Sequence, residues 1–295
     1  MKLGSTSRKA PGLSKNVARP LLKWVGGKRQ LLAPISEKLP EKINTYFEPF
    51  VGGGAVFFAL RQEKRFKKAV LSDQNSELIE TYRSVRDDVE GVVRELKKYR
   101  HSEEAYYEAR AQNPRSPLKC AARMIYLNRT GYNGLYRVNR SGKFNVPFGR
   151  YVRPNYCDEE HLHAVALALK GVRLEIADFE ELVASCRPGD AVYFDPPYVP
   201  VSPTAKFSEY HHKAFDDAEH ERLEICYGKL WERGVATVLS NSDTPRTREL
   251  FDKYEHEFVS ARRSINSVSK KRGPIEEILV FGGKRKRTRK KKAAR

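Results

Sequence analysis

A glycine-rich turn between a strand-like and a helix-like segment constrains the fold of this sequence more than any other feature. The segment 44–50 is rich in aromatic residues, the glycine turn 51–54 follows it, and residues 55–60 have the composition of the first turns of a helix. A second strand-like run, 69–72, ends at Asp73. This alternation of strands and helices predicts a mainly parallel, doubly wound sheet.

The alternation continues in the second half of the chain. Four short runs there are rich in β-branched or aromatic residues and have polar flanks, namely 172–176, 191–194, 236–239 and 278–281. Between residues 84 and 158 the alternation lapses into a helical stretch and a segment rich in Gly, Asn, Arg and Tyr. We therefore expect a smaller helical domain inserted into the α/β domain.

The first helix after Asp73 can be placed from its apolar residues. Ser76 can cap it, and steps of three and four separate the apolar residues Leu78, Tyr82, Val85, Val89, Val92, Leu96 and Tyr99. Such spacing is typical of a helix face that packs on a core. Gly91 is the residue at which this helix can break.

The charge of the chain favours a polyanionic partner. Lys and Arg number 56 against 37 Asp and Glu, a net charge of +19, and segment 284–295 holds nine of these basic residues. The other 283 residues still carry +10. Nucleic acid is the leading partner class, because phosphate contacts release counterions; the alternative is a Lys-rich surface that only maintains solubility. We expect a disordered leader over 1–18 and a disordered basic arm over 284–295, which also resembles a nuclear localisation patch.

Cysteine spacing and hydropathy exclude several classes. The four cysteines form no CxxC pair, and no His cluster has zinc spacing, so we expect reduced, mostly buried thiols and no metal. No apolar run approaches the ~20 residues that cross a bilayer, and residues 1–18 lack the apolar stretch of a signal peptide. We expect a soluble intracellular protein.

The sharpest chemical motif is Asp195-Pro196-Pro197-Tyr198, directly after the apolar run 191–194. Open α/β sheets bind ligands at the carboxyl ends of their strands. Asp195 and the Pro196 carbonyl can accept hydrogen bonds from both hydrogens of an adenine amine, and Tyr198 can stack on a base swung out of a duplex. The alternative is a proline turn that closes a strand, with an aspartate cap.

A second motif combines the glycine turn with an acid on the next strand. Asp73 lies 23 residues after Phe50, a spacing that suits an adenosine site in which the acid accepts from ribose hydroxyls. A dinucleotide site is disfavoured, because Phe57 stands where a small residue is needed. Near the start of the chain, Trp24 and Lys28 flank two glycines; the lysine can reach a carboxylate while the indole packs on a cofactor, or both can be structural.

These motifs occur in the order of a known family. The sequence resembles the Dam-type (D12 class) DNA adenine methyltransferases through KWVGGK, EPFVGGGAVFF, LSDQNSELI, LNRTGYNGLYRVNRSGKFNVPFGRY, FDPPYVPVSPTAKFSEYH and LSNSDT, spread over 19–281. The resemblance implies a Rossmann-like methyltransferase sheet with an inserted helical target-recognition domain and hairpin, and S-adenosyl-L-methionine as cofactor. It implies cofactor contacts from Trp24, Lys28, Phe50, Gly52, Gly54, Asp73, Asp178 and Asp195.

The resemblance also extends to the segment that reads DNA. Residues 132–137 and 144–151 are similar to the recognition hairpin of members that read GATC, which implies a bidentate pairing of Arg137 with a guanine. DNA contacts are implied for Lys23, Tyr132, Asn133, Leu135, Arg137, Pro147 and Tyr151, and contacts to the flipped nucleotide for Ser202, Thr204 and Tyr210. A plain β-hairpin with a solvated arginine is the alternative.

We therefore expect a site-specific adenine methyltransferase that acts on double-stranded DNA by direct transfer, with Asp195, Pro196 and Tyr198 as its catalytic residues. The expected divisions are 1–18, leader; 19–83, first part of the catalytic domain; 84–158, target-recognition domain; 159–283, second part of the catalytic domain; and 284–295, basic arm. We expect a monomer in the cytoplasm, associated with the nucleoid in a prokaryote. The rivals are an RNA or protein amino methyltransferase and a non-catalytic DNA-binding protein.

Overall fold

A computed structural model describes residues 17–24, 28, 30–139, 141–200, 215–262 and 274–283. Most of the expected leader, the whole basic arm and the residues Ser202, Thr204 and Tyr210 lie outside the described residues. The described part contains every other residue singled out from the sequence for a role in the site.

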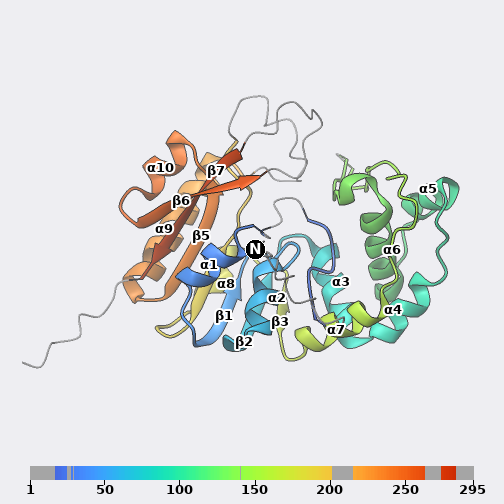
Figure 1. Cartoon of the computed structure of the whole chain (residues 1–295), viewed down its shortest axis with the longest axis horizontal. Helices are drawn as coiled ribbons and strands as arrows, with labels where there is room; N and C mark the ends of the chain where they lie inside the picture. Colours follow the sequence, from blue (N-terminus) through green and yellow to red (C-terminus); the bar gives the residue numbers. More distant parts are fainter. Residues whose placement is uncertain are drawn as a thin grey trace, which may run out of the picture.

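A seven-stranded sheet forms the centre of the molecule, in the order β3-β2-β1-β4-β5-β7-β6 (Figure 1). The strands are β1 (Ile43–Glu48), β2 (Phe66–Ser72), β3 (Arg173–Glu175), β4 (Ala191–Phe194), β5 (Ala236–Ser242), β6 (Glu255–Arg262) and β7 (Pro274–Gly282). The first five are parallel, and β7 runs antiparallel to both β5 and β6. The predicted α/β class with a Rossmann-like sheet is confirmed.

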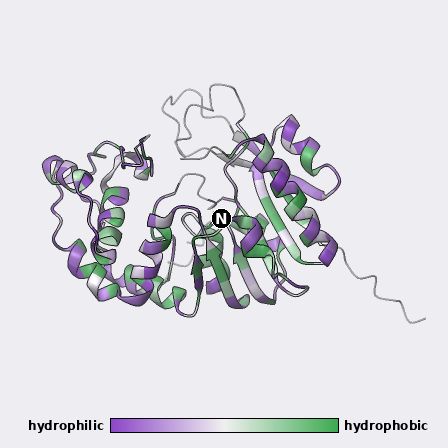
Figure 2. Ribbon diagram, turned by 180° about the vertical axis from the view of Figure 1, so that it is seen from behind, coloured by the Kyte–Doolittle hydropathy of each residue, from purple (hydrophilic) through white to green (hydrophobic). Residues whose placement is uncertain are grey.

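Successive side chains of the central strands enter two different hydrophobic clusters. Tyr193 packs in one cluster, whereas its neighbours Val192 and Phe194 pack in the other, because side chains alternate between the faces of a strand. One cluster contains residues of α1 (Leu32–Lys38), α2 (Ala55–Gln62), α3 (Ser76–Asp87) and α7 (Glu159–Leu169). The other contains residues of α8 (Phe179–Val183), α9 (Asp217–Arg233) and α10 (Pro245–Phe251). Helices therefore cover both faces, and Figure 2 shows the hydrophobic residues concentrated in the strands between them.

The helix predicted from Ser76 is divided, but not where the sequence suggested. Asn75, rather than Ser76, caps α3, since its side chain accepts a hydrogen bond from the Leu78 N–H. The break falls at Asp88, whose carboxylate accepts from the Gly91 N–H at 2.8 Å and caps α4 (Val89–Leu96). Gly91 suits this position in α4, because a Cβ there would require the Asp88 carboxylate and the Leu118 side chain to move.

Helices interrupt the strand alternation where the sequence indicated. The helices α4, α5 (Glu103–Ala111) and α6 (Pro117–Thr130) lie at the end of the molecule away from β6 and β7 (Figure 1). Buried residues of these helices belong to the same hydrophobic cluster that covers one face of the sheet. The helical segment therefore shares one hydrophobic core with a face of the sheet.

Candidate active site

The carboxyl ends of four neighbouring strands gather the acidic residues that the sequence singled out. Asp73 follows β2, Asp178 lies three residues after β3, and Asp195 follows β4. The glycine turn follows β1. The order in which successive strands are added to the sheet reverses between β1 and β4. Open α/β sheets bind ligands at such a switch point.

Asp195 is held by a buried lysine. The Lys28 Nζ lies 2.7 Å from Asp195 Oδ1, and the lysine side chain is only 5% exposed. Ser240 Oγ donates to the same carboxylate oxygen at 3.1 Å, and Tyr193 Oη bonds to Ser240 Oγ at 2.8 Å. Burial raises the pKa of Asp195, while the positive charge of Lys28 and the two hydrogen bonds oppose that rise. The result is a fixed hydrogen-bond acceptor in surroundings of low polarity.

Glu48 is a second buried acid that the sequence reasoning missed. It ends β1 and is 2% exposed, and Tyr46 Oη donates a hydrogen bond to it at 2.8 Å. Burial raises the pKa of Glu48 to about 8, with a further contribution from the Asp195 carboxylate. The sequence signal that could have identified Glu48 is its position at the end of a strand, just before the glycine turn.

The Asp-Pro-Pro-Tyr segment is fixed from two other strands. Tyr198 Oη donates to Glu277 Oε2 of β7 at 2.6 Å, and the Lys28 Nζ lies 4.6 Å from the centre of the Tyr198 ring. The Val199 N–H donates to Asn241 Oδ1 of β5 at 2.9 Å. Pro196 lies between these anchors and Asp195. Neither Glu277 nor Asn241 was singled out from the sequence, because only the fold brings β5 and β7 to this segment.

The glycine turn is held by the acid of the neighbouring strand. Asp73 Oδ2 accepts a hydrogen bond from the Gly52 N–H at 3.1 Å. Gly52 and Gly54 have φ values of +44° and +68°, which disfavour any side chain. A Cβ on Gly52 would also lie 2.7 Å from the indole of Trp24. Trp24 therefore packs directly on the turn.

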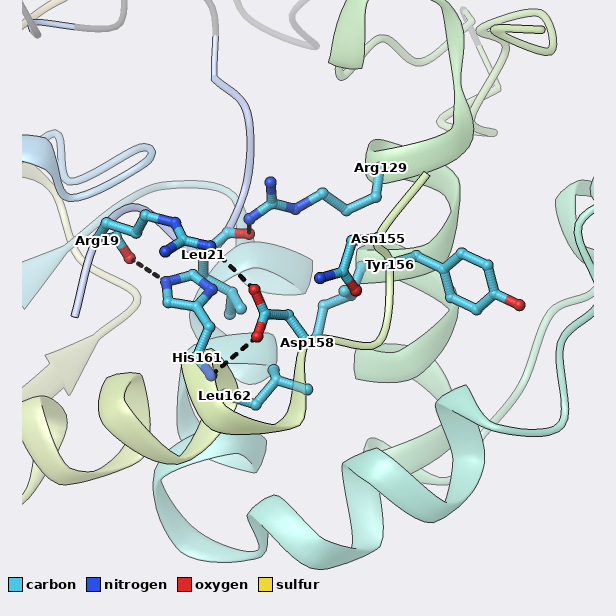
Figure 3. Close-up of a pocket in the computed structure, with 9 residues that line it drawn as sticks. Arg19, Leu21, Arg129, Asn155, Tyr156, Asp158, His161 and Leu162 are labelled. Atoms are coloured by element: carbon cyan, nitrogen blue, oxygen red, sulfur yellow. Dashed lines mark hydrogen bonds and ion pairs between the residues drawn. The ribbon is translucent and has the colours of Figure 1, made fainter. Parts of the chain in front are cut away.

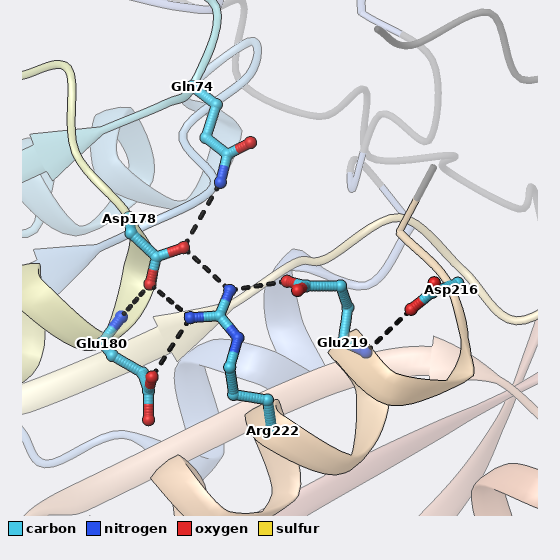
Figure 4. A network of polar contacts seen from close by, with 6 residues as sticks. All are labelled: Gln74, Asp178, Glu180, Asp216, Glu219 and Arg222. Atoms are coloured by element: carbon cyan, nitrogen blue, oxygen red, sulfur yellow. Dashed lines mark hydrogen bonds and ion pairs between the residues drawn. The ribbon is translucent and has the colours of Figure 1, made fainter. Parts of the chain in front are cut away.

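Asp178 lies in a charged network beside a cluster of aromatic rings. The two guanidinium Nη atoms of Arg222 each donate to one Asp178 oxygen at 2.8 Å, and Gln74 approaches the carboxylate at 3.4 Å (Figure 4). Burial raises the pKa of Asp178, but the Arg222 bonds outweigh burial and hold it below its usual value. The Phe50 ring centre lies 5.6 Å from that of Phe179.

The recognition segment folds back on itself in the antiparallel sense, and a tight turn at Tyr132–Gly134 interrupts its first half. Tyr132, Asn133 and Gly134 form the short 3-10 helix η1 (Tyr132–Gly134), in which Asn133 has a φ of +55°. Isolated antiparallel bridges join Gly131 to Phe148 and Val138 to Phe144. Tyr132 is 49% exposed, so its ring is available to a ligand.

Arg137 is partly engaged inside this segment. Its Nε donates to Asn145 Oδ1 at 2.7 Å and its Nη2 to the Asn145 carbonyl at 3.1 Å. Lys23 lies against the same segment, since its Nζ is 4.6 Å from the centre of the Tyr151 ring. Leu135 and Pro147 also belong to this part of the chain, and Leu135 packs against the hydrophobic core.

The described ranges contain no group of three or more His, Cys, Asp or Glu residues that could hold a metal ion. No helix among them is both long and apolar enough to cross a membrane. All four cysteines are free; Cys186 and Cys226 are buried as expected, whereas Cys120 and Cys157 are half-buried.

Known proteins resemble the chain over most of its length. The family model of the D12 class N6 adenine-specific DNA methyltransferases matches residues 24–265. A type II methyltransferase of Lactococcus lactis subsp. cremoris is 41% identical over 272 residues, which cover 89% of this chain and 94% of the relative. A type II methyltransferase of Methanocaldococcus jannaschii is 40% identical over 89% of this chain and 98% of its own. A DNA adenine methylase of Escherichia coli K12 is 39% identical, with shares of 89% and 95%.

Proposed function

Because the chain belongs to the D12 class of N6 adenine-specific DNA methyltransferases, we propose that it methylates the 6-amino group of a flipped adenine within GATC in duplex DNA. S-adenosyl-L-methionine is the proposed methyl donor. The relatives include proteins named type II methyltransferase and DNA adenine methylase. We propose that the enzyme acts as a monomer in the cytoplasm, where it reaches DNA.

The residues at the carboxyl edge of the sheet fit this donor. When bound, S-adenosyl-L-methionine supplies an electrophilic methyl group on a sulfonium centre. Asp73 is the proposed acceptor for the ribose hydroxyls, the role of acids at this position of a Rossmann-like sheet. Asp178 and Phe50 offer a carboxylate and an apolar ring for the adenine of the cofactor, and Gly52 and Gly54 allow the turn its positive φ values and its close contact with Trp24. Trp24 and Lys28 complete the proposed cofactor set.

Catalysis rests on hydrogen-bond acceptors at the target amine. The lone pair of this amine is delocalised into the adenine ring, so accepting hydrogen bonds from both N–H groups favours its pyramidal form in the transition state. Asp195 Oδ and the Pro196 carbonyl are the proposed acceptors. Tyr198 stacks on the flipped base, and the bond from its hydroxyl to Glu277 holds the ring in one orientation. Positioning and fixed electrostatics supply most of the rate.

DNA recognition is assigned to the turn and its flanks. Arg137 reads a guanine edge with the guanidinium N–H groups that do not bind Asn145. Tyr132 and Asn133 contact the DNA at the point where the target base is flipped out of the duplex. Leu135, Pro147, Tyr151 and Lys23 contact neighbouring bases or phosphates. We propose residues 84–158 as the target-recognition domain, with 19–83 and 159–283 as the two parts of the catalytic domain. The leader and the basic arm are proposed to add affinity that does not depend on sequence.

The observation that carries this proposal is the buried Lys28–Asp195 pair at the carboxyl end of β4. Its test is Asp195→Ala, for which we expect unchanged DNA affinity and no detectable methyl transfer. Asp87→Ala is the matched control, because the Asp87 carboxylate pairs with Arg86 at an exposed site. Activity of Asp195→Ala within tenfold of the wild type would refute the assigned role. Transfer to RNA in preference to duplex DNA, or absence of cofactor binding by calorimetry, would favour the rival functions.

A further inference from the structure

Asn128, near the end of α6, joins two segments that are far apart in the sequence. Its Oδ1 accepts a hydrogen bond from the Lys23 N–H at 2.8 Å. Its Nδ2 donates to the Lys23 carbonyl at 2.8 Å and to the Gly134 carbonyl at 3.1 Å. The side chain is completely buried, and both N–H donors of the amide are used. One amide therefore fixes the main chain of Lys23 to the turn at Gly134.

The same two segments pack together without space between them. A Cβ on Gly134, where φ is +62°, would lie 2.6 Å from the Lys23 Cβ. The residue after Lys23 and the second residue after Gly134 also meet, since the Trp24 indole stacks on the Tyr136 ring at 5.2 Å between ring centres. Tyr136 Oη in turn donates to Glu77 of α3 at 2.9 Å. A shift of the turn must therefore move Lys23 and Trp24 as well.

This segment also contacts the glycine turn of the proposed cofactor site. A Cβ on Gly52 would lie 2.7 Å from the Trp24 indole, so the indole packs directly on that turn. The Gly52 N–H in turn donates to Asp73. A displacement of the Gly134 carbonyl can therefore reach the glycine turn through Asn128, Lys23 and Trp24.

Residues before Lys23 have separate anchors that do not involve the recognition turn. Arg129 donates to the Leu21 carbonyl at 2.6 Å, His161 bonds to the Arg19 carbonyl at 2.9 Å, and Arg19 pairs with Asp158 at 2.9 Å (Figure 3). Asn128 and Arg129 are adjacent on α6 and hold adjacent parts of the same segment. Only Asn128 also binds the turn, so Arg129 provides a matched control.

We propose that Asn128 is a positioning residue that couples DNA reading by the turn to methyl transfer at Asp195. This inference rests on the proposed function. In it, contact of the turn with the correct base pairs sets the position of the Gly134 carbonyl, and Asn128 transmits that position to the Lys23 main chain and, through the neighbouring Trp24, to the glycine turn of the proposed cofactor site. A duplex with a wrong base pair leaves the cofactor and the target amine at Asp195 in a less reactive arrangement.

The test compares methyl transfer rates on two duplexes, one containing GATC and one in which the guanine assigned to Arg137 is replaced. We expect Asn128→Ala to lower kcat on GATC at least tenfold and to change the slow rate on the altered duplex less than twofold. Cofactor affinity without DNA should stay within twofold. Arg129→Ala loosens the segment without touching the turn, and its ratio of the two rates should stay within twofold of the wild type.

Three outcomes would overturn the inference. They are equal losses on both duplexes, which is what a merely structural role produces; no loss on either; and an equal fall in the ratio for Arg129→Ala. If Asn128→Ala does not fold, Asn128→Ser gives the same test, because its hydroxyl keeps a polar group in the buried site but cannot replace both N–H donors of the amide. A wild-type enzyme inactive on every duplex would refute the proposed function itself, whereas an active wild type with uniform losses would refute only the coupling.

Discussion

Removal of the Lys28 ammonium should change both the stability of the protein and the pH dependence of its activity. The Nζ of Lys28 lies 2.7 Å from Asp195, with side-chain exposures of 5% and 22%, so Lys28→Met leaves a buried carboxylate without its main partner. Breaking such a pair from one side costs about 3–5 kcal/mol. The variant should lose stability of that order at pH 8.

The effect on activity follows from the charge state that Asp195 needs. Burial already raises its pKa, and Lys28 opposes that rise, so loss of Lys28 raises the pKa further. Asp195 must be ionised to act as the stronger acceptor, so activity falls as the pH drops through this pKa. In Lys28→Met the acidic limb of the kcat profile should therefore move to higher pH than in the wild type.

The assay is methyl transfer at saturating cofactor and DNA between pH 5.5 and 9, with calorimetric unfolding at pH 6 and 8. Lys38→Met is the control. Lys38, the last residue of α1, pairs with Glu257 at 2.6 Å, and these two side chains are more exposed than those of Lys28 and Asp195. An acidic limb that coincides with that of the wild type would refute the assigned electrostatic role of Lys28. So would equal effects of the two substitutions.

Three further predictions concern other parts of the site. The Glu48 carboxyl has a pKa of about 8 in the folded state, so it stays protonated at a pH where it ionises in the unfolded state. The folded state therefore loses stability as the pH rises from about 4.5 to 8. Glu48→Gln should abolish up to about 4 kcal/mol of this loss between about pH 5 and 8, measured by urea unfolding. Arg137→Ala should reduce discrimination at one guanine by about 1–3 kcal/mol, measured as the ratio of kcat/KM on cognate and altered duplexes. The Arg222 guanidinium orients Asp178, so Arg222→Ala should weaken cofactor binding about tenfold in calorimetry. The kcat at saturating cofactor should change less than twofold. An unchanged cofactor affinity would refute the orienting role of Arg222.

The sequence predicted β4 because burial on both faces leaves an unambiguous apolar run, and the run 191–194 coincides with this strand. The predicted run 172–176 contains β3, in which the buried Leu174 lies between the charged residues Arg173 and Glu175. The strand β6 was missed, since Glu255, His256 and Glu257 give its beginning the composition of a surface loop. It is an edge strand that pairs only with β7, so its stability comes from a partner distant in sequence.

Individual residues of the site could be found from the sequence, but their partners could not. The sequence predicted that Lys28 can reach a carboxylate but did not indicate which one. In the folded chain this partner is Asp195, which lies 167 positions further along the sequence. Asn128 and Arg222 carry no local signal, because an asparagine in a helix and an arginine on a polar helix face are ordinary. Their importance follows only from which backbone carbonyls and carboxylates the packing places next to them.

The measurement that tests the central claim most directly is transfer of labelled methyl to duplex oligonucleotides with and without GATC, followed by identification of the modified base. Labelled N6-methyladenine found only in the GATC duplex is the predicted result. Label at adenines outside GATC would keep the reaction and contradict the assigned specificity. No label in any duplex, from a protein that still binds DNA, would contradict the proposal that this chain is an active adenine methyltransferase.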